Sequence, residues 1–169
     1  FAADERAIDT VVQRGQPDVY AHNVEVVPSL QRKMRDARCS WERSLMTLRA
    51  ARAAGASVTK SSLMVGCGET EAEVHDALAE LRAADVSVVT IGQYLRPTPK
   101  HAPLVRYVEP AEFDAYRAAG EKLGFQYVAS GPLVRSSYRA AEAFLKGKLR
   151  GERVRYSDRY GKRRLEVVS

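Results

Sequence analysis

The chain has 169 residues, of which 45% are hydrophobic and 28% are charged. This length suffices for one domain with a substantial core, and the composition is ordinary for a globular protein. No apolar run reaches the length of a membrane-spanning helix, so no such helix is predicted. Because the sequence starts with Phe1 and no signal-like segment opens it, we expect a fragment of a longer protein or an incomplete gene model.

The net charge of +6 is concentrated near the C-terminus. Nine basic and two acidic residues lie in the stretch 146–164, which leaves the rest of the chain nearly neutral. We therefore predict two regions, a folded domain over residues 1–145 and a basic tail over 146–169. Such a tail is either solvated or disordered, or a docking strip for an acidic partner or nucleic acid.

Helical and strand-like patterns alternate along the chain. Glycines end three of the predicted helices, and Thr70 followed by Glu73 is typical of a helix start. The predicted helices cover 4–15, 40–55, 70–86, 109–124 and 138–149, and the predicted strands cover 18–27, 57–66, 87–95 and 125–134.

Strict alternation of helices with apolar strands predicts an α/β fold with a parallel sheet and right-handed crossovers. Four strands with their helices make half of an (α/β) barrel, and the last predicted helix makes a helical C-terminal extension. No second domain and no internal repeat is evident.

Polar residues lie in or directly after each predicted strand, toward the ends where parallel α/β folds gather their sites. They are His22, Asn23 and Glu25; Lys60, Ser61 and the run Gly66–Thr70; Gln93, Tyr94, Arg96 and His101; and Arg135, Ser136 and Ser137. Four such groups in succession indicate a composite site. Each group alone also fits strand-end turns, an exposed lysine or a loop histidine, and no hydrolase triad, HExxH motif or Walker loop is present.

The two cysteines, Cys39 and Cys67, lie far apart and have no metal-ligand spacing. We interpret them as packing or surface thiols. The chain is not a disulfide scaffold, and a reducing compartment is expected.

Four sequence blocks together resemble lipoyl synthase, a family of radical S-adenosylmethionine enzymes. They are DVYAHNVE, TKSSLMVGCGET, TIGQYLRPT followed by His101, and ASGPLVRSSY, in the family's order and spacing. The resemblance extends from Phe1 to about Leu145 and corresponds to the second half of the family's barrel.

The resemblance implies a cofactor-driven reaction. Members insert two sulfur atoms at carbons 6 and 8 of an octanoyl chain on a carrier lysine. One 4Fe–4S cluster cleaves S-adenosylmethionine to a 5′-deoxyadenosyl radical, and a second cluster donates the sulfur. Such C–H bonds are beyond the reach of side-chain acids and bases.

The resemblance also implies residue roles. Ser137, with Ser136 as the alternative, would ligate an iron of the second cluster, where oxygen is a less well matched ligand than thiolate. The expected cofactor-binding residues are Asn23, Glu25, Arg43, Lys60, Gly66, Gly68, Gln93, Tyr94 and Arg135. A serine pair that satisfies its own backbone is the plain alternative for residues 136–137.

The chain departs from the family pattern at four positions, with Val26 for Thr, Ser62 for Gly, Cys67 for Leu and Arg96 for Gln. The cysteines that hold both clusters in the family lie upstream of the matched region. We therefore expect this chain alone to catalyse nothing and to be an incomplete sequence or one half of a split enzyme.

The implied partners are octanoylated lipoyl carrier domains, which include the acyltransferase subunits of 2-oxoacid dehydrogenases and the H protein of glycine cleavage, and iron–sulfur delivery proteins. No nucleic-acid partner is expected. Residues 31–45 and 135–149 look closer to mitochondrial members, which favours the matrix, or the cytoplasm for a bacterial protein.

Two other functions stay open: a non-catalytic half that docks a carrier domain or acidic partner, and a non-radical barrel enzyme that uses Lys60 or Glu69 as acid–base.

Overall fold

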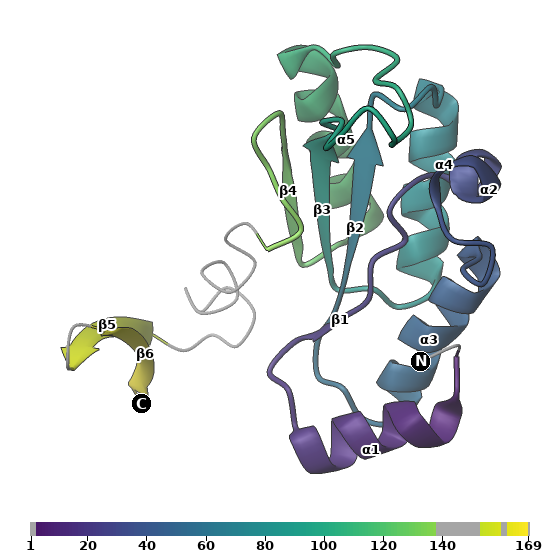
Figure 1. Cartoon of the computed structure of the whole chain (residues 1–169). Coiled ribbons are helices and arrows are strands. Elements are labelled where there is room, and N and C mark those ends of the chain that lie inside the picture. The colour runs from purple at the N-terminus through teal and green to yellow at the C-terminus, as the bar shows by residue number, and fades with distance from the viewer. Residues whose placement is uncertain (1–2, 138–152, 160–161, 169) are drawn as a thin grey trace.

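Four parallel strands form one sheet in the order β1–β2–β3–β4 in the computed structural model (Figure 1), which describes residues 3–137, 153–159 and 162–168. The strands are Tyr20–Ala21, Thr59–Val65, Val88–Gln93 and Tyr127–Gly131. All three pairings are parallel, so the predicted sheet is confirmed. The alternation of strands and helices is consistent with part of a barrel.

Helices connect the strands much as the sequence predicts. The long helices are α1 (Glu5–Gly15), α3 (Trp41–Ala53), α4 (Glu71–Ala83) and α5 (Pro110–Leu123). A short 3-10 turn, η1 (Pro28–Leu30), and a single turn of helix, α2 (Gln31–Met34), were not predicted. They are too short to show a periodic apolar pattern.

Side-chain alternation divides the sheet into two faces. Leu63, Val65, Val89, Ile91 and Val128 belong to the main hydrophobic core, together with residues of α3, α4 and α5. Figure 1 shows these helices gathered beside the sheet, while α1 lies across the end where the strands begin. The alternate residues of β2 and β3 therefore face away from the helices, and they include Lys60, Ser62, Thr90 and Gly92.

The prediction of one continuous strand over 18–27 is wrong. Regular pairing stops after Ala21, which lies opposite Lys60, and resumes in a single bridge between Glu25 and Leu63. The first strand thus has one residue more than its partner between these two points, which is a β-bulge. Glu25 closes the bulge with a φ of +68°, a left-handed conformation that the alternating apolar pattern could not reveal.

The predicted helix over 138–149 lies outside the described residues. Within the predicted basic tail, strands β5 (Arg153–Arg159) and β6 (Lys162–Val168) pair antiparallel. The sequence pattern did not predict these strands. Val154 and Tyr156 do alternate with charged residues, but the charge run favoured a tail.

Among the residues that the structure describes, no helix has the length and apolar character that crossing a membrane requires.

The start of α4 tests the local sequence signals. The Thr70 side chain accepts from the Glu73 N–H at 3.3 Å, and the Glu73 carboxylate accepts from the Thr70 N–H at 2.7 Å. Thr70→Ala should lower the free energy of unfolding by about 1 kcal/mol. Thr10→Ala is the control, because Thr10 is an exposed residue within α1 and alanine is favoured there, so it should cost less than about 0.5 kcal/mol. Urea unfolding measures both, and equal losses would contradict the capping role.

Candidate functional site

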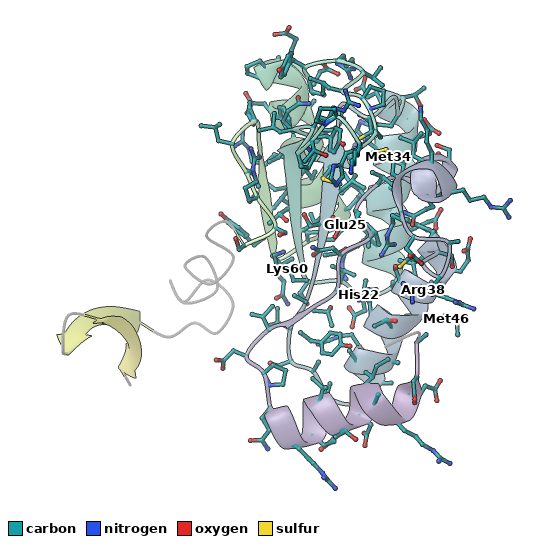
Figure 2. The ribbon with its side chains drawn as sticks, in the orientation of Figure 1. His22, Glu25, Met34, Arg38, Met46 and Lys60 are labelled. Atoms are coloured by element: carbon teal, nitrogen blue, oxygen red, sulfur yellow. The ribbon has the colours of Figure 1, made fainter. Side chains whose placement is uncertain are left out.

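A cavity of about 600 Å³ lies on the sheet face that points away from the helices. It brings together residues from four parts of the chain, namely the bulged first strand, the end of α2, β2 and the segment after β4. The lining residues are Val19, Ala21, His22, Asn23, Glu25, Arg35, Lys60, Ser136 and Ser137. Figure 2 shows His22, Glu25 and Lys60 in one region beside β1 and β2. Five of the predicted site residues (Asn23, Glu25, Lys60, Ser136 and Ser137) thus share one cavity, of a size that suits a small ligand.

Lys60 is the buried cation of this cavity. Its side chain is only 4% exposed, and the one hydrogen bond of its ammonium to a described residue is a long one, 3.5 Å to the Thr90 hydroxyl. Burial lowers the pKa of Lys60, and the nearby Glu25 carboxylate opposes that shift. The ammonium is therefore poorly compensated within the described part of the chain, which suits a group that receives an anionic ligand.

Glu25 is held by its backbone rather than by its carboxylate. Its N–H donates to the Ser62 carbonyl at 3.0 Å, and its carbonyl accepts from the Met64 N–H at 2.7 Å. The carboxylate accepts no hydrogen bond from the described residues, so it is available to a ligand. A non-glycine residue with positive φ costs about 1–3 kcal/mol, and such strain is common at functional sites.

His22 and Arg35 also line the cavity. His22 belongs to the first polar group of the predicted composite site, but neither residue has a predicted role in binding. Burial and the nearby Arg35 guanidinium lower the pKa of His22, which favours a neutral imidazole at pH 7. Arg35 donates to the Gln31 side chain at 2.9 Å and the Ser44 hydroxyl at 3.0 Å, which ties α2 to α3 beside the cavity. Only the tertiary fold brings Arg35 here, so no local signal could have found it.

Arg43 does not line this cavity. It lies on α3 in an adjoining cavity of about 320 Å³, where its guanidinium donates to the Arg38 carbonyl at 2.9 Å. His22 and Arg35 line both cavities. The role of Arg43 in ligand contact stays a prediction.

The Gly66–Glu69 loop binds its own carboxylate. Glu69 is buried and accepts from the N–H groups of Gly66 at 2.6 Å and Cys67 at 2.9 Å. Gly66 and Gly68 both have positive φ, the backbone form that favours glycine. The expected approach of a ligand to these glycines stays a prediction, whereas the hydrogen bonds of Glu69 explain this residue as a loop anchor.

Gln93 and Tyr94 are buried and organise the loop after β3. The Gln93 amide donates to the carbonyls of Val65 and Arg106, each at 3.2 Å, and accepts from the Val108 N–H at 2.8 Å. The Tyr94 hydroxyl donates to the Ala102 carbonyl at 2.9 Å.

A smaller cavity of about 190 Å³ adjoins the main one. Gln93 and Arg135 line it, and it shares Glu25 and Ser136 with the main cavity. Tyr94 lines neither of these two cavities.

The described residues include no group of three or more His, Cys, Asp or Glu side chains that could hold a metal ion. Cys39 is exposed, and Cys67 is buried in an apolar cluster with Val26 and Tyr94. Burial raises the pKa of Cys67 to about 12, so its thiol stays protonated. Among the described residues, neither cysteine belongs to a group of side chains that could hold a metal ion.

Comparison with known proteins identifies the class first. The Radical SAM superfamily profile matches residues 1–81. The chain is 52% identical over 154 residues to "Lipoyl synthase, mitochondrial" of Coprinopsis cinerea, covering 91% of this chain and 39% of that protein. It is 52% identical over 147 residues to "Lipoyl synthase, chloroplastic" of Arabidopsis thaliana, covering 86% and 37%. To "Lipoyl synthase" of an Anaeromyxobacter species it is 53% identical over 150 residues, covering 88% and 51%.

These matches place the chain in a radical S-adenosylmethionine class, and the parallel α/β sheet is consistent with that class. Within that class the chain belongs to the lipoyl synthase family, as its sequence motifs indicated. It spans about 37–51% of the length of these three relatives.

Lys60 yields a stability prediction. Lys60→Met should leave the free energy of unfolding at pH 7 unchanged or raise it, by up to about 3 kcal/mol, because it removes a poorly compensated buried charge. Since the folded pKa lies below the ordinary value, the unfolded chain binds more protons between the two, and wild-type stability rises with pH there. The advantage of the variant should therefore narrow as the pH approaches 10. Urea unfolding from pH 7 to 10 measures it, and a less stable variant at pH 7 would contradict this account.

The left-handed backbone at Glu25 gives a second prediction. Glu25→Gly should be more stable than Glu25→Ala by about 1 kcal/mol, because only glycine adopts positive φ without strain. At Glu42, in the first turn of α3, the order should reverse, and alanine should be more stable than glycine by about 1 kcal/mol. Chemical unfolding of the four variants measures both differences. If alanine is more stable than glycine at position 25 as well as at position 42, the backbone at Glu25 carries no strain.

Proposed function

We propose that this chain forms part of the barrel of a lipoyl synthase, an enzyme that inserts two sulfur atoms at carbons 6 and 8 of a protein-bound octanoyl chain. One observation carries the proposal: Asn23, Glu25, Lys60, Ser136 and Ser137, from motifs far apart in sequence, line a single cavity. The similarity to lipoyl synthases over about nine-tenths of the chain supports the same conclusion.

The cavity residues fit S-adenosylmethionine. Its amino-acid end carries an ammonium and a carboxylate, and the cavity offers the free Glu25 carboxylate and the poorly compensated Lys60 ammonium. Asn23 would add an amide that can both donate and accept. When bound beside an iron–sulfur cluster, this cofactor supplies the radical chemistry that side chains cannot. The chain's own residues bind and orient the cofactor on the open face of the sheet.

We propose two 4Fe–4S clusters in the complete enzyme, with their cysteine ligands outside this chain. The described residues contain no cysteine set for either cluster. Ser137, with Ser136 as the alternative, would contribute one oxygen ligand to the second cluster. Both serines are exposed at the cavity, where a ligand could reach their hydroxyls. The remaining proposed cofactor-binding residues are Arg43, Gly66, Gly68, Gln93, Tyr94 and Arg135.

Octanoylated lipoyl carrier domains are the proposed protein substrates, and the basic region 146–169 is a candidate surface for an acidic carrier. Relatives named as mitochondrial support a mitochondrial location, although relatives named as chloroplastic and bacterial members are equally similar.

Ser137→Ala tests the proposal in the complete protein with both clusters. The barrel should stay folded, because one exposed hydroxyl is lost. Cleavage of S-adenosylmethionine should continue, whereas formation of lipoyl product should fall at least tenfold, because the sulfur-donating cluster loses a ligand. In Ser137→Cys, a thiolate should retain the cluster while product forms more slowly.

The measurement is lipoyl product and cleaved S-adenosylmethionine per enzyme, with cluster content by iron analysis. Ser136→Ala is the matched control. Normal product from Ser137→Ala together with loss in Ser136→Ala would move the ligand to Ser136. If neither variant separates the two yields, the ligand proposal is wrong.

A further inference from the structure

The segment 132–137, which we call the return segment, folds back across the open face of the sheet after β4. Its turn is closed by the Val134 N–H, which donates to the Gly131 carbonyl at 3.1 Å. Val134 is buried, whereas Leu133 beside it is 80% exposed. The return segment is therefore held to the sheet at Val134, and Ser136 and Ser137 follow directly from that point.

Gly92 of β3 lies where the return segment crosses the sheet. A Cβ atom at position 92 would lie 2.1 Å from the Val134 carbonyl oxygen and 3.1 Å from the Val134 carbonyl carbon. Non-bonded carbon and oxygen atoms do not approach so closely, so the return segment could not keep its place. Gly92 has no positive φ, and its backbone would accept any residue. Glycine is therefore required at position 92 because a side chain has no room there, and not because of the backbone conformation.

Arg135 also holds the same carbonyl. The Arg135 guanidinium donates to the Val134 carbonyl at 2.8 Å and to the Pro132 carbonyl at 3.3 Å. Gly92 thus provides the room and Arg135 the hydrogen bonds that fix this point of the chain. Gly131 lies opposite Gly92 in β4, and a Cβ atom at position 131 would make only an ordinary contact, 3.5 Å from a Val134 methyl.

We infer that Gly92 is a positioning residue for the serine pair: it allows the return segment to lie against the sheet and so sets where Ser136 and Ser137 meet the cavity. A methyl group at position 92 would displace the Val134 carbonyl by about 1 Å. The catalytic consequence rests on the proposed function of the serines. A misplacement of this size costs about 100-fold where geometry matters.

Three single variants in the complete enzyme test this inference. Gly92→Ala places the methyl group against Val134. Gly131→Ala is the matched control, because its Cβ would meet only a Val134 methyl at 3.5 Å, an ordinary contact. Gly120→Ala controls for stability, because its Cβ would lie 2.9 Å from a Val128 methyl within the core, away from the return segment.

The first readout is amide hydrogen exchange of a peptide that covers 132–137, measured without cofactor. Gly92→Ala should raise this exchange at least tenfold relative to the β2 amides, whereas the two controls should not. The second readout is lipoyl product per cleaved S-adenosylmethionine, which should fall about 100-fold in Gly92→Ala alone.

The outcomes are distinguishable. Unchanged exchange at 132–137 in Gly92→Ala overturns the positioning role. Raised exchange with a normal product ratio overturns the catalytic consequence, and with it the proposed role of the serines. If Gly92→Ala does not fold, Arg135→Met loosens the same carbonyl without adding bulk, and unchanged exchange there overturns the inference equally.

Discussion

The alternation of side chains along β2 and β3 is the constraint on which the rest of the structure depends. Leu63, Val65, Val89 and Ile91 bury one face of the sheet against α3, α4 and α5. Because successive side chains point to opposite faces, the same packing holds Lys60, Ser62, Thr90 and Gly92 on the other face. A slip of one residue would bury Lys60 among the helices and expose Leu63, at a cost of several kcal/mol. The hydrophobic core therefore fixes the side of the sheet on which the polar cavity forms, before any ligand is present.

The cavity contains two features that work against stability. Glu25 has a left-handed backbone at the bulge, and Lys60 places an ammonium where water is largely excluded. Neither feature improves packing, and each would cost about 1–3 kcal/mol in an ordinary position. Their coincidence in one cavity has a simple explanation if a ligand supplies the missing partners, since sites that bind charged ligands commonly sacrifice stability for affinity.

The sequence predicts the regular elements well because their signals are local. The capping pair of Thr70 and Glu73 and the apolar runs of β2 and β3 depend only on neighbouring residues. The bulge at Glu25 was missed because an alternating pattern looks the same with one extra residue. The strands β5 and β6 were missed because their many charged residues favoured the prediction of a tail. At the site, the motifs name Asn23, Glu25, Lys60 and the serine pair, and these five residues line one cavity. Arg43 falls in the adjoining cavity, and Gln93 and Tyr94 bind the loop after β3. Arg35 reaches the cavity only through tertiary packing, so no local pattern contains it.

The serine pair shows why a motif and its geometry have different origins. The letters RSSY define which atoms are offered, but the return segment does not by itself determine where those atoms lie. The contacts that place them come from β3, at Gly92, from the backbone carbonyl of Gly131 in β4, and from the guanidinium of Arg135 folded back on its own turn. A chain with the same motif but a larger residue at position 92 would offer identical chemistry at a displaced point. In the proposed function, the motif would therefore act only together with the glycine on the neighbouring strand, and the parallel sheet brings the two together.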